Sequence, residues 1–207
     1  MNKHTLTKAA IGLTLGSTLV LAGCADAGDG ADMEGHDMGN GSPSQDTSQN
    51  TGADAAGAND ADVMFAQMMI PHHEQALVMS RIVLDKDGVD PGVVDLATRI
   101  ESAQEPEIAT MEGFLDEWGA EPTGDHSGHE MDGMLSEAEI QALEAADAAT
   151  VSRLFLEGMI AHHEGAVDMA KAELADGENP EALALAQKII DAQEQEIQEM
   201  QALLAAL

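Results

Sequence analysis

Phe65-Ala-Gln-Met-Met-Ile-Pro-His-His-Glu-Gln-Ala-Leu-Val-Met79 is the stretch that decides the fold, because the chain repeats it ninety residues later. The second copy reads Phe155-Leu-Glu-Gly-Met-Ile-Ala-His-His-Glu-Gly-Ala-Val-Asp-Met169, and eight of the fifteen positions are identical. A further pair of segments also repeats, because Ala103-Gln-Glu-Pro-Glu-Ile108 matches Ala192-Gln-Glu-Gln-Glu-Ile197. The sequence therefore predicts an internal duplication, in which a His-His segment is followed by a Gln-Glu segment in each half.

The segments around these repeats have the pattern of α-helices. Their apolar residues recur at helical rather than alternating spacing, and Ala, Leu, Met, Glu and Gln dominate them. Pro91 and Pro180 stand where a proline opens a helix, and Ser136-Glu-Ala-Glu139 has the pattern of a capping box. The predicted helices span about residues 61–85, 92–118, 137–146, 148–176 and 180–205. No segment has a convincing strand pattern, so the predicted fold class is all-α, a four-helix bundle made of two duplicated helix hairpins.

The first residues have the features of an export signal. Lys3 and Lys8 precede an apolar run of about 14 residues, which is too short to span a bilayer core of roughly 30 Å. The run ends in Leu21-Ala-Gly-Cys24, which resembles the lipobox of bacterial lipoproteins, where the cysteine receives the lipid. We expect residues 1–23 to be removed and Cys24 to anchor an extracytoplasmic protein to the bacterial cell membrane.

The remainder of the chain divides into a tether and a folded part. Residues 24–59 are rich in Gly, Asp, Ser, Asn and Ala and contain almost no large apolar residue, which predicts a disordered tether. Residues 60–207 have a normal length for one domain. The duplication predicts two halves, about 60–118 and 136–207, joined by a linker at 119–135.

The charge of the chain limits its partners. The formal net charge is −31, and removal of residues 1–23 leaves 6 basic against 39 acidic residues, which is −33. Such a surface repels nucleic acid and anionic lipid head groups, and it concentrates cations. Nucleic acid is therefore excluded as a partner, whereas a metal ion is favoured. Cys24 is the only cysteine, so disulfides and thiolate metal sites are excluded as well.

The repeated segment carries residues that bind metal ions. At about 100° per residue, His72 shares one side of its helix with Met68, Ala76 and Met79. The same spacing predicts that one histidine of each pair points inward and that its neighbour lies at the bundle edge. Imidazole and thioether are borderline to soft ligands, and thioether favours Cu(I), with Zn(II), Ni(II) or another transition metal as the weaker choice. The predicted metal ligands are His72, His73, His162, His163, Met69, Met79, Met159 and Met169.

Other residues of these types have competing interpretations. The His-His pairs themselves could instead be buried, hydrogen-bonded histidines that fix the packing of the helices. Methionines at helical spacing are usually core residues, which is the expectation for Met64, Met111 and Met200. Glutamates on helices usually face solvent, and the alternative is that they bind the metal or support one of its ligands; the first is the expectation for Glu74, Glu105, Glu107, Glu164, Glu194 and Glu196. Three histidines lie in loop clusters that also contain methionine: His36, His126 and His129. These clusters either capture metal ions or are low-complexity sequence exposed to solvent.

The two motif copies resemble the DUF305 domain family of secreted bacterial proteins. The family pattern is Met-Ile-x-His-His-x-x-Ala, found here at 69–76 and 159–166, with Gln-x-x-Glu-Ile-x-x-Met following in a second helix at 104–111 and 193–200. The resemblance covers residues 60–207. It implies a ferritin-like helical bundle, and some relatives are associated with copper binding and copper tolerance. It does not imply an enzyme, and the Glu-x-x-His pairs of ferritin-like di-iron sites are missing from both repeats.

The function predicted from these features is extracytoplasmic copper binding by a membrane-anchored lipoprotein, for buffering, resistance or delivery. A metal-dependent oxidoreductase on the same scaffold is the first alternative. The second is a structural or interaction lipoprotein in which the histidines only pack the bundle. No nucleophile constellation or Gly-rich phosphate loop favours another class of function.

Overall fold

The structure is a computed structural model that describes residues 57–122 and 131–207. Its elements are α1 (Asp60–Leu84), α2 (Pro91–Trp118), α3 (Glu137–Ala145), α4 (Ala148–Asp176) and α5 (Pro180–Ala206). These two ranges contain no strand, which confirms the all-α prediction, and every helix begins and ends within one residue of its predicted bounds. No helix within the described ranges has the length and apolar character needed to cross a membrane.

Side chains next to the helices determine where the helices begin. Asn59 and Ser136 each accept a backbone hydrogen bond and form a capping box with the acidic residue three positions later. Asp90 and Asn179 cap helices whose first turns contain a proline, and Asp147 caps α4. Capping side chains of this kind are visible in the sequence, which is why the helix bounds could be predicted closely.

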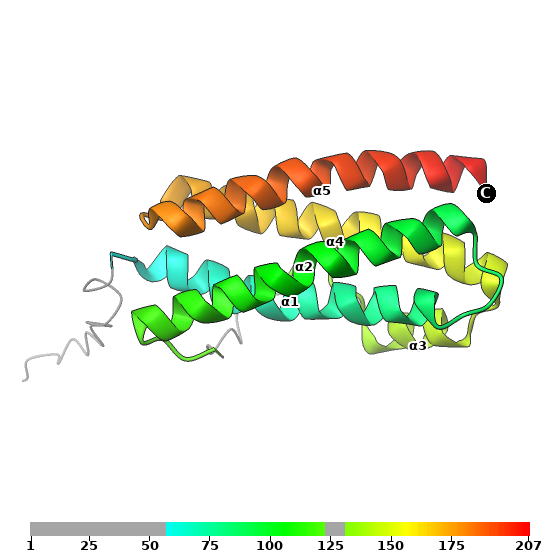
Figure 1. Cartoon of the computed structure of the whole chain (residues 1–207), viewed down its shortest axis with the longest axis horizontal. Coiled ribbons are helices and arrows are strands. Elements are labelled where there is room, and N and C mark those ends of the chain that lie inside the picture. Colours follow the sequence, from blue (N-terminus) through cyan, green and yellow to red (C-terminus); the bar gives the residue numbers. More distant parts are fainter. Residues whose placement is uncertain (1–56, 123–130) are drawn as a thin grey trace, which may run out of the picture. The chain divides into compact units, whose positions relative to one another are not determined.

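The four long helices pack as two hairpins, α1 with α2 and α4 with α5 (Figure 1). The hairpins meet mainly through α1 and α4, whereas α2 and α5 make fewer contacts with each other, and the short α3 touches α1 and α4. The two helices that carry the His-His segments therefore face each other. This arrangement brings the two copies of the repeated segment together.

The core consists of two apolar clusters, one on each side of a polar layer. Along α2, α4 and α5, the residues of one cluster are separated from those of the other by buried or half-buried polar residues near the middle of the helix, and α1 follows the same division except at Leu77. Each helix contributes two such residues: His72, His73, Gln104, Glu107, His162, His163, Gln193 and Glu196. A buried polar layer costs free energy unless its groups are paired, so its presence at the centre of the bundle requires an explanation.

The start of α1 is tied to the turn between α4 and α5 by a buried carboxylate. Asp62 accepts hydrogen bonds from the backbone N–H groups of Asn59, Glu178 and Asn179. The Glu173 carboxyl lies against that of Asp62, and burial together with this neighbour raises the pKa of Glu173 to about 8. At neutral pH Glu173 is therefore protonated beside the ionised Asp62, so the two carboxyl groups do not repel each other at this end of the hairpins.

Candidate metal centre

All four histidines of the repeated segments are buried. His72, His73 and His163 are fully enclosed and His162 is 1% exposed. The expectation that one member of each pair lies at the bundle edge is therefore wrong. A single helix turns its adjacent residues about 100° apart, but α2 and α5 cover the second histidine of each pair.

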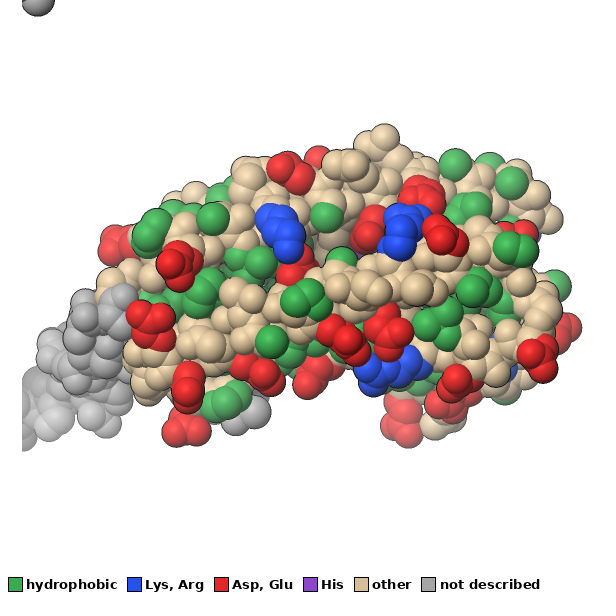
Figure 2. Space-filling model, viewed as in Figure 1, with side chains coloured by type: hydrophobic (Ala, Val, Ile, Leu, Met, Phe, Trp, Pro, Cys, Tyr) green, Lys and Arg blue, Asp and Glu red, His purple; other side chains and the backbone are tan. Residues whose placement is uncertain are grey.

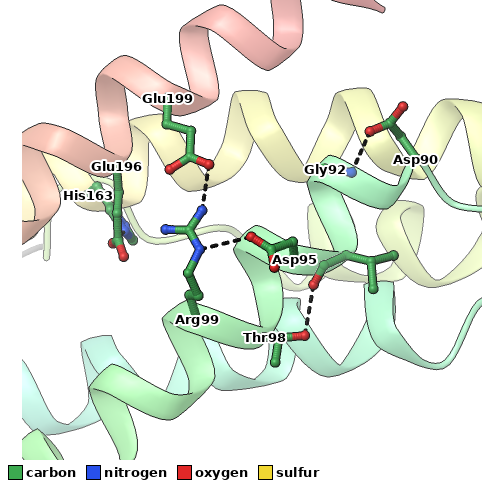
Figure 3. A network of polar contacts seen from close by, with 9 residues as sticks. Asp90, Gly92, Asp95, Thr98, Arg99, His163, Glu196 and Glu199 are labelled. Atoms are coloured by element: carbon green, nitrogen blue, oxygen red, sulfur yellow. Dashed lines mark hydrogen bonds and ion pairs between the residues drawn. The ribbon is translucent and has the colours of Figure 1, made fainter.

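Each second histidine is hydrogen bonded to a glutamate of its own hairpin. His73 Nε2 lies 3.1 Å from Glu107 Oε2, and His163 Nε2 lies 2.8 Å from Glu196 Oε2. Figure 3 shows His163 and Glu196 next to each other between α4 and α5. Lys188 also reaches Glu107, at 3.2 Å. The duplication thus extends to a repeated histidine–carboxylate pair.

The charge states of these groups fix which ring nitrogen carries the proton. Burial lowers the pKa of His73, although Glu107 opposes this effect, so the imidazole is neutral at physiological pH. Burial works to raise the pKa of Glu107, but His73 and Lys188 outweigh it and keep the carboxylate ionised. Because a carboxylate only accepts, His73 Nε2 donates, and its lone pair lies on Nδ1. That Nδ1 is buried and has no hydrogen-bond partner among the described residues.

The first histidines of the two repeats meet at the interface between α1 and α4. The ring centroids of His72 and His162 are 3.7 Å apart, with 38° between their planes. Burial lowers the pKa of His72 to about 3 and takes that of His162 well below its usual value. Both rings are therefore neutral, and an imidazole lone pair lies in the plane of its ring. An ion shared by the two residues would bind at the ring edges rather than between the faces.

The ring nitrogens of the first histidines are poorly satisfied. His72 Nε2 donates to the backbone carbonyl of Asp132 at 3.3 Å, but its Nδ1 has no partner among the described residues. Both nitrogens of His162 lack a hydrogen-bond partner there as well, although the backbone of His72 lies close to the His162 ring. Buried nitrogens without partners cost free energy, so a ligand that accepts their lone pairs would offset that cost.

The predicted methionine ligands divide between the two apolar clusters. Met69 and Met169 belong to or pack against one cluster, whereas Met79 and Met159 belong to the other. Only Met169 of these four is partly exposed. The thioethers therefore lie on both sides of the histidine layer. Several predicted residues fall outside the described ranges: Cys24, His36, His126 and His129.

Two glutamates that were expected to face solvent belong to the polar layer instead. Glu107 is buried and Glu196 is half-buried, both against histidines, so the expectation that they face water is wrong. Gln104 and Gln193 join them in the polar layer. The signal was present in the sequence, because these residues share their helix faces with apolar residues three, four and seven positions away. The prediction was correct for the other four glutamates, which are exposed: Glu74, Glu105, Glu164 and Glu194.

Among residues 57–122 and 131–207, no group of three or more His, Cys, Asp and Glu side chains is arranged to hold a metal ion. A closed site of the type that Zn(II) prefers is therefore not present in these ranges.

The exterior of the bundle is acidic on the face that Figure 2 shows. Acidic side chains are spread over this face with few basic ones between them.

Comparison with known proteins places the chain in a family. The model of the domain of unknown function DUF305 matches residues 62–204. The crystal structure of a DUF305 fragment from Deinococcus radiodurans is 34% identical, covers 73% of this chain and 99% of that chain, and has a TM-score of 0.66. A DUF305 protein from Streptomyces coelicolor, predicted to be secreted, is also 34% identical, with coverages of 70% and 93% and a TM-score of 0.67.

A third similar structure is that of CopM in its Cu(I)-bound form. It is 32% identical, covers 70% of this chain and 96% of that chain, and has a TM-score of 0.59. CopM has also been solved with Cu(II) and with Ag bound. A search of curated proteins gave no significant match. With its helices, its two motif copies and the match over residues 62–204, this chain belongs to the DUF305 family.

Proposed function

We propose that this protein binds copper, as Cu(I), at the histidine layer of its bundle. The observation that carries the proposal is His162, which is buried beside His72 with neither ring nitrogen paired among the described residues. The Nδ1 atoms of His73 and His163 are unpaired as well. His72, His73 and His162 are neutral imidazoles with free lone pairs at the centre of the bundle, which suits an ion that the protein encloses.

The chemistry of the surrounding groups supports a soft monovalent ion. Thioether sulfur favours Cu(I) over hard ions, and methionines lie on both sides of the histidines. Metal-binding histidines commonly donate their second ring N–H to a carboxylate, which is the arrangement of His73 with Glu107 and of His163 with Glu196. The predicted ligand set is therefore kept: the four histidines, with Met69, Met79, Met159 and Met169 as additional donors.

The relatives support the same function. CopM, at 32% identity, has been solved with Cu(I) bound. We further propose that the bundle is ferritin-like and arose by duplication of a helix hairpin, with residues 1–23 as signal, 24–59 as tether and 119–135 as linker. Anchored outside the cytoplasm through Cys24, the acidic chain would attract cations and buffer or deliver copper rather than act as an enzyme.

An anaerobic Cu(I) titration against a competing chelator tests the proposal. The wild-type protein is compared with a variant in which His72, His73, His162 and His163 are all replaced by alanine. We expect the affinity for Cu(I) to fall by at least about 100-fold, because the borderline nitrogen ligands are removed. Circular dichroism shows whether the variant stays helical, and the double variant H72Q/H162Q removes fewer packed atoms.

Retained stoichiometry and affinity in both variants would contradict the proposal. A variant that unfolds while wild-type stability does not respond to Cu(I) would support the packing role of the histidines instead. If Cu(I) binds only the native state, a concentration about 100 times the Kd should raise the unfolding free energy of the wild type by about 3 kcal/mol.

Glu107→Gln tests the carboxylate that orients His73. We expect Cu(I) affinity to fall roughly 10- to 100-fold, because a neutral amide holds the Nε2–H of His73 less strongly than a carboxylate does. Glu105→Gln is the matched control, since Glu105 lies on the same helix but is exposed and paired with Arg81. Equal affinities for the two variants in the same chelator competition would show that Glu107 does not support a metal ligand.

A further inference from the structure

A cavity of about 310 Å³ opens beside the histidine layer, between α1, α4 and the residues that precede α3. It is a separate feature from the histidine layer, because no histidine lines it. The lining residues on these two helices come from the N-terminal half of α1 and the C-terminal half of α4. Three segments distant in sequence therefore meet around one opening.

Four methionines line this cavity: Met64, Met68, Met131 and Met169. Met64 is 41% exposed, so the expectation that it fills the core is wrong. The other three are partly buried, unlike Met111 and Met200, which are fully enclosed as predicted. Packing accounts for methionines in the core. It does not account for four thioethers gathered around an opening to solvent.

The cavity also carries negative charge. Asp132, Asp168 and Asp176 line it and are exposed, and no lysine or arginine does. Carboxylates at the mouth of a cleft raise the local concentration of cations. Thioethers inside the cleft select soft cations from among them. The combination distinguishes this cavity from a simple apolar groove.

The cavity is connected to the histidines along both helices. Met64, Met68 and His72 follow one another at four-residue spacing on α1, so each step is about 6 Å along the helix. Met169 lies about two turns from His162 on α4. Asp132 forms part of the cavity wall, and its carbonyl accepts the hydrogen bond of His72 Nε2. Asp132 therefore contacts the cavity on one side and His72 on the other.

The second repeat lacks the thioether that Met68 supplies in the first. Gly158 occupies the place of Met68 in the second repeat. A Cβ atom at Gly158 would lie 3.1 Å from Leu135 and 3.3 Å from Met79, so side chains already fill this space. This asymmetry between the repeats places Met68 in the cavity beside α1, without a counterpart at the matching position of α4.

We infer that Met64, Met68 and Met131, together with Met169, which this site shares with the histidine layer, form a second site, which takes a monovalent soft cation, Cu(I) or Ag(I), at the mouth of the bundle and passes it to the histidines. This inference rests on the proposed function, because the histidines are the destination. The site binds more weakly than the histidine layer, since its thioethers lie in an open cavity that water can enter. Its role is entry and transfer rather than retention.

Titration with Ag(I), which needs no protection from air, tests the inference on the purified protein. The variant M64L/M68L/M131L removes three thioethers with nearly unchanged volume, so its fold should be retained. We expect it to bind about one Ag(I) ion fewer than the wild type, to keep the tight histidine-bound ion, and to load that ion roughly tenfold more slowly. Met134→Leu is the matched control, because Met134 belongs to the same linker but lines a different cavity.

The outcomes separate this inference from the proposed function. Unchanged stoichiometry and loading rate in the triple variant would overturn the second site. The second site would also be overturned if Met134→Leu bound one Ag(I) ion fewer and loaded as slowly as the triple variant. Loss of the tight ion as well would show that the thioethers belong to the histidine site and not to a separate one. The four-histidine variant should still bind the weaker ion, with only sulfur ligands visible by X-ray absorption. If that variant kept the tight ion, the proposed function would fail instead.

Discussion

The metal-free protein is expected to lose about 2 kcal/mol of unfolding free energy from His72 alone when the pH falls from 7 to 5. In the folded protein burial lowers the pKa of His72 to about 3, whereas the unfolded chain titrates near 6.5. Between these two values the unfolded chain binds more protons. The stability is therefore fully present above pH 6.5 and is lost as the pH falls toward 3.

Two further buried histidines act in the same direction. The pKa values of His73 and His162 are also lowered by burial, so both add to the loss. Urea unfolding followed by circular dichroism between pH 5 and 7.5 measures the effect, in a range where Glu107 stays ionised. Glu173, whose pKa is raised to about 8, contributes a slope of the opposite sign in this range, and it does so equally in the wild type and in a His72 variant. The variant H72Q should have a flatter pH profile than the wild type. Identical slopes for the two proteins would show that His72 is not held neutral by the fold.

The fold could be predicted closely because its determinants are local. The capping residue Ser136 and the prolines at positions 91 and 180 mark helix starts within a few residues of sequence. The duplication then supplied the pairing, because two copies of one hairpin that each bury an apolar stripe must pack face to face. Neither step required knowledge of distant contacts.

The candidate site could be predicted only in part, because its burial depends on the partner helix. The helical wheel of α1 alone places His73 about 100° from His72, toward an edge. Only the packing of α2 turns that edge into an interior position and brings Glu107 to His73. The spacing of Gln104, Glu107 and Met111 on one face of α2 was the available signal for this contact.

The linker was the least predictable part of the fold. It crosses the helices of the two repeats at a place where their sequences differ. Gln75 and Gly165 occupy the same place in the two copies. Gln75 exchanges two hydrogen bonds with the backbone of Leu135, at 2.7 and 2.8 Å. Gly165 lies directly under the carbonyl of Asp132. The linker segment 132–135, which we call the strap, therefore contacts both copies. Its position depends on a long polar side chain in the first copy and on the absence of a side chain in the second.

Gly165→Ala is expected to displace this strap and expose the histidines. A Cβ atom at position 165 would lie 1.9 Å from the Asp132 carbonyl oxygen and 2.7 Å from its carbon, which only a backbone shift can relieve. The shift removes the acceptor of His72 Nε2. We expect a loss of about 1–3 kcal/mol of unfolding free energy, even though alanine is the better helix former.

Gly113→Ala provides the matched control for that effect. Gly113 is also inside a helix, but a Cβ atom there meets nothing within 4 Å, so this substitution should stabilise the protein by about 1 kcal/mol. Urea unfolding compares the two variants, and diethyl pyrocarbonate reports whether the buried imidazoles have become reactive. In Gly165→Ala they should react, and Cu(I) should load faster because the strap no longer covers His72. If both variants were equally stable and equally unreactive, the strap would not be the barrier between solvent and the histidine layer.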